Sequence, residues 1–216
     1  MFAVSAQGTF LRPESEAKNM KTDLVFHPTA VTASTRAAAK AQRPVVIWFT
    51  GLSGAGKSTI ANGLEQGLLA KGRHTFLLDG DNIRLGLCRD LGFSDQDREE
   101  NIRRIAEVSR LFLDSGLITI TSFISPFHRD RIIARDIIGH DAFIEVFIDA
   151  PLPECERRDP KGLYGKARAG LIKNFTGIDS LYEPPLSPDV HINTFENDIE
   201  TSVNLILSFL EKRERQ

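Results

Sequence analysis

Cysteine is scarce in this chain, and the two that occur, Cys88 and Cys155, lie far apart in the sequence. This argues against a disulfide framework, and reduced thiols in a cytoplasmic protein are expected. Long apolar runs are lacking too, since none approaches the roughly 20 residues of a membrane span. The first 21 residues have no unbroken apolar core of a secretory signal, and Glu14 and Glu16 argue against a transit peptide.

Charge of one sign is not in excess. The chain of 216 residues has a formal net charge of −2, with 26% charged and 41% hydrophobic residues. This balance gives no reason to expect a nucleic-acid or membrane surface as partner, and it is ordinary for a soluble globular protein. The length suits one α/β domain with some extensions.

One glycine-rich stretch is the most informative part of the sequence. It follows the pattern G-x-x-x-x-G-K-[ST] and then continues to Thr59, with the residues Gly51, Leu52, Ser53, Gly54, Ala55, Gly56, Lys57 and Ser58. The apolar run before it, 45–50, predicts a buried parallel strand, and 58–69 can form a helix. A strand, a glycine loop and a helix in this order predict a phosphate-binding loop for a nucleoside triphosphate.

The residue types of this loop explain the prediction. Glycines let the backbone wrap closely around an anion, and the helix that follows adds the positive end of its dipole. Lys57 is predicted to reach the β- and γ-phosphates, and Ser58 to offer its hydroxyl to Mg²⁺. The alternative is a glycine-rich structural turn, which leaves the Lys57-Ser58-Thr59 sequence unexplained. The loop by itself does not identify the acceptor.

Strands and helices alternate after the loop. Further strands are predicted at 75–79, 117–123, 143–148 and 191–193, and helices at 97–114, 129–138 and 199–210. Repeated β-α units imply a P-loop NTPase-type three-layer α/β/α fold, with a mostly parallel central sheet and ligands at the carboxyl ends of its strands. Residues 1–43 are predicted to be an N-terminal extension with a short surface helix within 32–43, and 44–216 to be the P-loop domain.

Two strand ends carry residues suited to phosphoryl transfer. Asp79 and Asp81 flank a glycine beside Arg84, and such carboxylates can hold Mg²⁺ or accept a hydroxyl proton. The alternative is an ordinary Asp/Asn turn after a strand. At the next strand end, Ser125-Pro126 can present a hydroxyl to the phosphates, or the proline can simply terminate the strand.

A segment at about 159–188 is predicted to act as a lid. Four glycines interrupt it, Pro184, Pro185 and Pro188 follow them, and a loop of this length in a compact domain is usually functional or disordered. Six cations lie in or next to it, near the single acid Asp159: Arg157, Arg158, Lys161, Lys166, Arg168 and Lys173. Such a segment can close over anionic groups and neutralise them, or it can be a solvated basic loop.

A series of short motifs runs through the chain at 79–84 (DGDNIR), 89–94 (RDLGFS), 100–104 (ENIRR), 124–126 (ISP), 158–164 (RDPKGLY) and 174–180 (NFTGIDS). This series resembles that of one enzyme family, the adenylylsulfate kinases. Their order and spacing match from about residue 24 to the C-terminus, and the set is highly specific. One stretch departs from the pattern: Phe127-His128-Arg129 follows the ISP motif, where family members vary.

The resemblance implies that ATP phosphorylates adenylyl sulfate at the ribose 3′-hydroxyl, giving ADP and 3′-phosphoadenylyl sulfate, in sulfate activation. It implies Arg84, Arg89 and Asn101 as contacts of the anionic part and the ribose, and Lys161 near the sulfate. Phe93 and Phe175 resemble the family's aromatic pair around adenine. The remaining substrate-binding residues taken from these motifs are Asp79, Asp81, Ile124, Ser125, Gly162 and Leu163. The family typically forms homodimers, and the resemblance adds a sulfurylase as a further candidate partner.

For the mechanism we expect direct in-line transfer. Lys57, Mg²⁺ and lid cations would offset the transferred charge, and Asp81 would orient or deprotonate the 3′-hydroxyl. Ser125 matches a serine described as phosphorylated in bacterial members of the family. Serine is a poor nucleophile without a base and no histidine is an obvious partner, so its covalent role stays open.

Three other functions compete with this interpretation. A different small-metabolite kinase, of the gluconate or shikimate type, shares the loop but needs neither two adenine-stacking phenylalanines nor a lysine lid. A GTP-binding switch requires an Asn-Lys-x-Asp stretch, which the sequence lacks. An inactive nucleotide-binding domain has no need for intact Lys57, Ser58, Asp79 and Asp81.

Overall fold

Five parallel strands form the central sheet of the computed structural model, in the order β2-β3-β1-β4-β5. They are β1 (Val46–Thr50), β2 (Thr75–Asp79), β3 (Ile118–Ser122), β4 (Phe143–Asp149) and β5 (Val190–Asn193). Because every pair is parallel, the carboxyl ends of all five strands lie at one edge. This confirms the predicted sheet.

The structure describes Val25 and residues 27–215. The chain divides into two units, Met1–Val31 and Thr32–Gln216, and the sheet belongs to the second. Most of the extension predicted at 1–43 therefore lies outside the described residues. None of the helices in the described part is long and apolar enough to cross a membrane.

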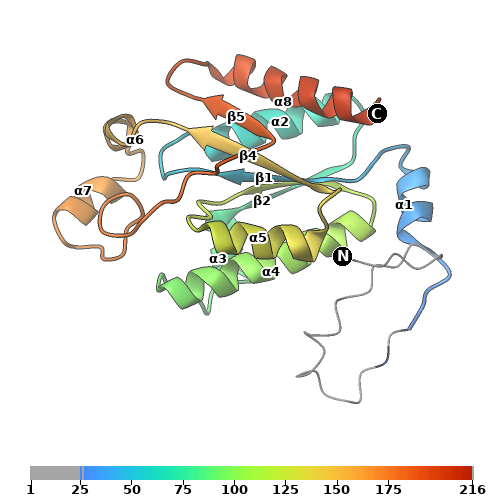
Figure 1. Ribbon diagram of the computed structural model, residues 1–216, viewed down its shortest axis with the longest axis horizontal. Coiled ribbons are helices and arrows are strands. Elements are labelled where there is room, and N and C mark those ends of the chain that lie inside the picture. Colours follow the sequence, from blue (N-terminus) through green and yellow to red (C-terminus); the bar gives the residue numbers. More distant parts are fainter. Residues whose placement is uncertain (1–24, 26, 216) are drawn as a thin grey trace. The chain divides into compact units, whose positions relative to one another are not determined.

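Helices cover both faces of the sheet (Figure 1). They are α1 (Ala33–Ala39), α2 (Lys57–Ala70), α3 (Gly80–Leu85), α4 (Asp95–Asp114), α5 (His128–Ile138), α6 (Leu152–Arg158), α7 (Leu163–Arg168) and α8 (Ile199–Glu214). The helices α2 and α8 lie on one face, and α4 and α5 on the other. Short α6 and α7 lie beyond the carboxyl ends of the strands, on the left of Figure 1. The predicted three-layer architecture is confirmed.

Strand β1 shows why its sequence is continuously apolar. Successive side chains of a strand point to opposite faces of the sheet. Ile47 and Phe49 accordingly join the hydrophobic core under α2 and α8, whereas Val46 and Trp48 join the core under α4 and α5. All four are fully buried. A central strand covered by helices on both faces has no side in contact with solvent. Its sequence therefore does not alternate between apolar and polar residues.

Helix α1 confirms the short helix predicted within 32–43. The Thr32 side chain accepts a hydrogen bond from the Thr35 N–H and begins the helix. Arg36 Nη1 donates to the Asp114 carbonyl at 3.3 Å, and Gln42 Nε2 donates to the Gly116 carbonyl at 2.8 Å. These contacts connect the residues just before β1 to the turn that follows α4.

Three short helices were not predicted: α3, α6 and α7. Each has only six or seven residues, too few to display a helical repeat of apolar positions. The expectation of irregular structure from residue 159 onward is wrong for Leu163–Arg168. There the carboxylate of Asp159 accepts the N–H groups of Leu163 and Gly165 and starts a helix, and Tyr164 and Ala167 are buried beneath it.

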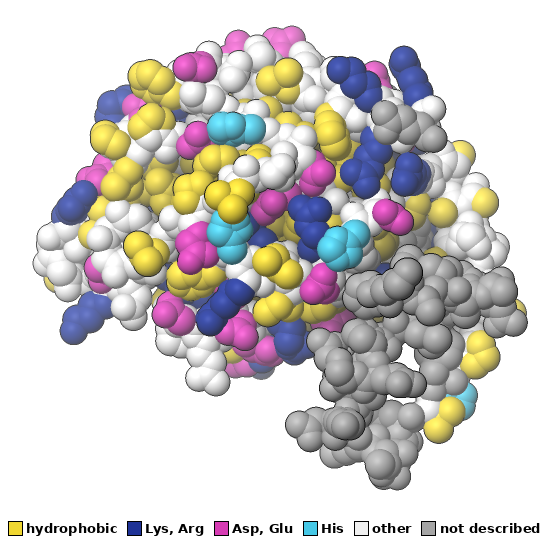
Figure 2. All heavy atoms as spheres, in the orientation of Figure 1, with side chains coloured by type: hydrophobic (Ala, Val, Ile, Leu, Met, Phe, Trp, Pro, Cys, Tyr) yellow, Lys and Arg dark blue, Asp and Glu magenta, His cyan; other side chains and the backbone are white. Residues whose placement is uncertain are grey.

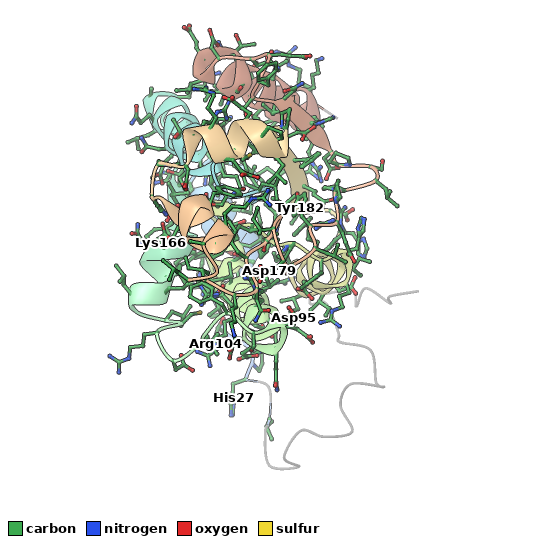
Figure 3. The ribbon with its side chains drawn as sticks, turned by 90° about the vertical axis from the view of Figure 1, so that its left-hand side faces the viewer. His27, Asp95, Arg104, Lys166, Asp179 and Tyr182 are labelled. Carbon is green, nitrogen blue, oxygen red and sulfur yellow. The ribbon has the colours of Figure 1, made fainter. Side chains whose placement is uncertain are left out.

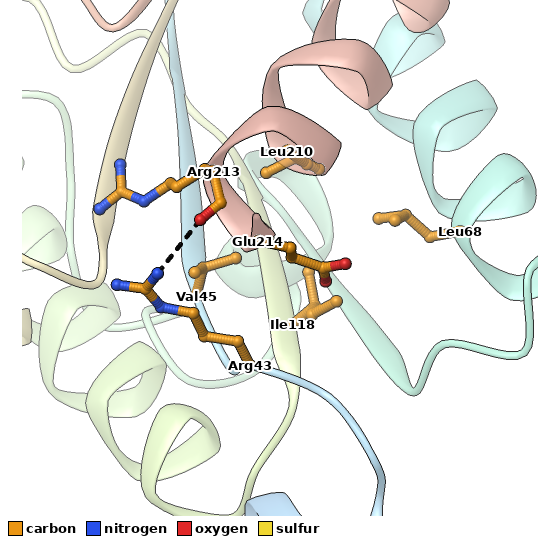
Figure 4. A pocket seen from close by; sticks show the side chains of 7 residues that line it. All are labelled: Arg43, Val45, Leu68, Ile118, Leu210, Arg213 and Glu214. Carbon is orange, nitrogen blue, oxygen red and sulfur yellow. Dashed lines mark hydrogen bonds between the residues drawn. The ribbon is translucent and has the colours of Figure 1, made fainter. Parts of the chain in front are cut away.

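A small cavity of about 20 Å³ lies at the amino ends of the strands (Figure 4). Its wall is formed by Arg43, Val45, Leu68, Ile118, Leu210, Arg213 and Glu214. Beside it the Arg43 Nη1 donates to the carbonyl of Arg213 at 3.3 Å. A space of this size holds about one water molecule and no metabolite. On the face that Figure 2 displays, acidic and basic side chains both occur among hydrophobic ones.

Two leucines of α2 provide a matched test of the core. Leu64 is fully buried against the sheet, whereas Leu69 is 65% exposed. Leu64→Ala should lower the free energy of unfolding by about 2–5 kcal/mol, because it leaves a cavity in the core. Leu69→Ala should change it by less than about 0.5 kcal/mol. Urea denaturation measures both, and equal effects would contradict the packing described for α2.

Candidate active site

The phosphate loop follows β1 at the carboxyl edge of the sheet, and its glycines are sterically required. Gly54 and Gly56 have φ of +75° and +100°, in the region that favours glycine. A Cβ on Gly54 would lie 2.9 Å from the carbonyl oxygen of Cys155, and one on Gly51 would collide with the carbonyl of Ile148. Gly56 is the N-cap residue of α2 and has no side chain to accept a hydrogen bond. The first N–H groups of α2 can therefore bind an anion.

Lys57 lies inside this loop and is 8% exposed. Its Nζ donates to the carbonyls of Gly51 at 2.9 Å and Leu52 at 2.7 Å. Burial lowers the pKa of Lys57 from 10.5 to about 8, while nearby Asp79 and Cys155 act in the opposite direction. Among the described residues its hydrogen-bond partners are both carbonyls, which phosphate oxygens can replace with stronger, charge-assisted hydrogen bonds.

Three side-chain oxygens meet at the start of α2. The Ser58 hydroxyl donates to Asp79 Oδ2 at 2.7 Å and lies 3.2 Å from the Ser122 hydroxyl. Mg²⁺ prefers oxygen ligands and is usually held by one or two protein groups together with substrate phosphates. The donor set therefore fits this ion. No group of three or more His, Cys, Asp or Glu suited to a metal occurs among the described residues.

A cavity of about 1090 Å³ opens next to the loop. Most of the predicted site residues line it, namely Ser53, Gly54, Gly56, Lys57, Ser58, Thr59, Asp79, Asp81, Arg84, Phe93, Asn101, Ile124, Ser125, Lys161, Leu163 and Phe175. The structure therefore brings together residues from the phosphate loop, two other strand ends, α4 and the predicted lid. Figure 3 views the molecule from this end, where Lys166 and Asp179 belong to the lid.

Five predicted residues do not line the cavity: Gly51, Leu52, Ala55, Arg89 and Gly162. The three loop residues lie behind it, since Ala55 is fully buried and the carbonyls of Gly51 and Leu52 bind Lys57. Arg89 is exposed in the turn after α3, where the buried neighbour Cys88 fixes the orientation of the chain.

The two predicted aromatic residues differ in their surroundings. Phe93 is 60% exposed, and the guanidinium carbon of Arg84 lies 4.4 Å from its ring centre. Phe175 is only 9% exposed, and its ring packs edge-on against Tyr164. Arg98, which was not predicted, lies 5.9 Å from the Phe93 ring and also lines the cavity. Its position three residues before Asn101 on α4 is the signal that could have identified it.

Asn101 and Ser125 are buried polar residues at the cavity wall. Asn101 is 3% exposed, and its side-chain N–H₂ has no hydrogen-bond partner among the described residues, so it can donate to a ligand. Ser125 has a φ of +43°, and its hydroxyl accepts a hydrogen bond from Trp48 Nε1 at 3.1 Å. An indole N–H is only a donor and cannot serve as the base that would activate serine.

The lid cations are more fully paired than the sequence analysis assumed. Glu154 on α6 binds Arg157 and Arg158, which lower its pKa to about 2, and Glu156 binds Arg168. The count of one acid near six cations was therefore wrong, because these two glutamates precede the segment and were left out. Lys161 instead forms an ion pair with Asp81 across the cavity mouth.

Comparisons with known proteins agree with this geometry. The sequence profile of the family described as adenylylsulphate kinase matches residues 43–193. The chain belongs to this family. The adenylyl-sulfate kinase of Pseudomonas aeruginosa is 62% identical over 182 residues, which cover 84% of this chain and 93% of that protein. That of Aeromonas hydrophila is 56% identical over 191 residues, covering 88% of this chain and 97% of that protein.

Solved structures of family members have the same fold. The APS kinase CysC of Mycobacterium tuberculosis, in complex with AMPPNP and APS, superposes with a TM-score of 0.75 at 49% identity. The match covers 78% of this chain and 98% of that one. A hexameric APS kinase from Thiobacillus denitrificans gives a TM-score of 0.60 at 27% identity, covering 98% of this chain and 42% of that one. The predicted family and P-loop kinase fold are confirmed.

The buried lysine makes stability depend on pH. Between pH 8 and about 10.5 the unfolded chain keeps a proton on Lys57 that the folded protein has released, so stability rises with pH. Lys57→Met removes this rise. The free energy of unfolding of the wild type relative to Lys57→Met should therefore increase by about 3 kcal/mol over this range.

Urea denaturation at several pH values measures this difference. Lys166→Met, on the exposed surface of α7, controls for the loss of a positive charge. If the difference in the free energy of unfolding between the wild type and Lys57→Met stayed constant from pH 8 to 10.5, burial would not destabilise the ammonium group.

Proposed function

We propose that this protein transfers the γ-phosphate of ATP to the ribose 3′-hydroxyl of adenylyl sulfate, giving ADP and 3′-phosphoadenylyl sulfate. One observation carries the proposal: a single cavity is lined both by the phosphate loop and by residues of the motif series, among them Asn101, Lys161 and Phe175. The Pseudomonas aeruginosa relative is named for this activity, and the Mycobacterium tuberculosis structure holds AMPPNP and APS.

The donor side of the cavity suits Mg·ATP. The uncapped start of α2 and the loop N–H groups would bind the phosphates, and Lys57 would leave its two carbonyl partners to contact the β- and γ-phosphates. Ser58, with Asp79 beside it, would hold Mg²⁺. When bound, Mg²⁺ neutralises phosphate charge during transfer.

The acceptor side suits a nucleotide with an anionic group. Asn101 would donate to the ribose or phosphosulfate, and Phe93 and Phe175 would contact the adenine ring, a stacking worth about 1–3 kcal/mol per base. Asp81 would orient or deprotonate the 3′-hydroxyl, which requires that its ion pair with Lys161 opens. Lys161 would then be released to bind the sulfate end, so that closing of the lid at 159–188 follows substrate binding.

The wider assignments rest on the same comparisons. We propose a homodimer, which the hexameric relative supports, and co-purification would test for a sulfurylase partner. A cytoplasmic location is supported by Cys88 and Cys155, which are both free and buried. A sugar kinase and a gluconokinase share the fold at 21% and 18% identity. Such a distant likeness does not identify the acceptor of this protein.

Formation of ADP from Mg·ATP tests the acceptor. Adenylyl sulfate should stimulate it strongly and yield a 3′-phosphorylated product, because both substrates fit one cavity. Lys57→Ala is the blank, since it removes the cation that contacts the transferred phosphate. If adenylyl sulfate left the rate of ADP formation unchanged and gluconate or another sugar raised it, the protein would still be a P-loop kinase, but the proposed acceptor would be wrong.

Ser125→Ala tests whether a covalent phosphoserine is needed. Because the Ser125 hydroxyl has Trp48 as its partner and not a base, turnover should stay within about tenfold of the wild type. Removing an obligatory nucleophile costs far more, about 10⁶-fold in a well-studied protease. Single-turnover kinetics measure the effect, with the exposed Ser187→Ala as control. A collapse of the chemical step in a folded variant would reinstate the covalent route.

A further inference from the structure

Tyr164 is a buried residue of the lid that the proposed chemistry does not use. It lies in the first turn of α7 and is only 2% exposed. The Asp159 carboxylate accepts the N–H groups of Leu163 at 2.8 Å and of Tyr164 at 3.2 Å, which fixes this turn. The side chain of Tyr164 therefore extends from a rigidly held backbone into the protein and not toward solvent.

One end of this side chain contacts the phosphate loop. The Tyr164 hydroxyl donates to the carbonyl oxygen of Ser53 at 2.9 Å. Burial raises the pKa of Tyr164, so the hydroxyl stays protonated and remains a donor. The neighbouring Gly54 packs against the carbonyl of Cys155 so tightly that it has no room for a Cβ. A movement of the loop backbone at Ser53 is therefore transmitted to the tyrosine.

The other side of Tyr164 contacts the acceptor half of the cavity. Its ring meets that of Phe175 edge to face, with centroids 5.0 Å apart and an interplanar angle of 78°. The turn that carries Phe175 is held by Asp179, which accepts the N–H groups of Asn174 and Phe175. Arg98 of α4 donates to the Asn174 carbonyl at 2.7 Å. The backbone that carries Phe175 is thus held from two sides, and the Tyr164 ring packs against its side chain.

We infer that Tyr164 is a positioning residue that couples the two nucleotide sites, because its hydroxyl contacts the phosphate loop while its ring sets the position of Phe175. The inference rests on the proposed function, since it assigns the Phe175 side of the cavity to adenylyl sulfate. When the phosphates of ATP replace the carbonyl partners of Lys57, the backbone next to Ser53 shifts, and Tyr164 transmits this shift to Phe175 at the acceptor base. Each nucleotide then favours the arrangement that suits the other.

Coupling of this kind is measurable and reciprocal. If the ATP analogue AMPPNP tightens adenylyl sulfate binding by some factor, adenylyl sulfate must tighten AMPPNP binding by the same factor. For the wild type we expect a factor of about five or more, within the usual range for coupled sites. Tyr164→Phe retains the ring contact and deletes the hydroxyl, which donates to the Ser53 carbonyl and also contacts the Cys155 thiol. The factor should then fall below about two.

The experiment is calorimetric titration of adenylyl sulfate with and without Mg·AMPPNP, and the reverse titration, on the full chain. The matched control is Tyr182→Phe, which removes the hydroxyl of the other tyrosine. That hydroxyl bonds to the side chain of Thr50 and not to the loop at Ser53. This control should retain the wild-type factor, and thermal unfolding verifies that each variant is folded.

A second pair of variants tests the other end of the bridge. Phe175→Leu and Phe93→Leu should both weaken adenylyl sulfate binding. Phe175→Leu should also lower the coupling factor, because Phe175 contacts Tyr164, whereas Phe93 contacts Arg84. An unchanged factor in Tyr164→Phe, or an equal loss in Tyr182→Phe, overturns the inference. A wild type that binds AMPPNP and no adenylyl sulfate overturns the proposed function instead.

Discussion

The site depends on a direct contact between backbone groups. The carbonyls of Ile148, in β4, and Cys155, in α6, lie so close to Gly51 and Gly54 that neither glycine has room for a side chain. This contact fixes the phosphate loop relative to the sheet and brings α6 against it. Since α7 and the rest of the lid follow α6 in the chain, the position of the acceptor half of the cavity also depends on the same contact.

The burial of Lys57 is the main electrostatic consequence of this packing. Burial lowers the pKa of Lys57 to about 8, and its ammonium group donates to two carbonyls, which carry no net charge and can give way to an incoming anion. Two neighbouring arginines, unlike Lys57, have a carboxylate partner. Glu154 pairs with Arg157 and Arg158, and Arg158 also donates to the carbonyl of Gly54 at 3.5 Å and lines the cavity, so it is a second cation beside the phosphate loop.

Much of this arrangement could be predicted from local patterns. The bounds of the strand at 75–79 were predicted as the structure has them, because an apolar run ends there at a turn-forming Asp-Gly. The phosphate loop was predicted from its spacing together with the strand before it and the helix after it, and the motif series identified the family, which the comparisons confirm. Short α3, α6 and α7 were missed because six or seven residues do not reveal a helical period.

The sequence by itself determined the order of strands and helices, the phosphate loop and the family, since each leaves a signature in residue type and spacing. Only the tertiary structure decided that Lys57 is buried, that Asp81 pairs with Lys161, that Arg89 does not line the cavity and that Tyr164 contacts both Ser53 and Phe175. These properties depend on distances between residues remote in sequence. Burial, and the charge pairing that follows from it, exist only once the chain has folded.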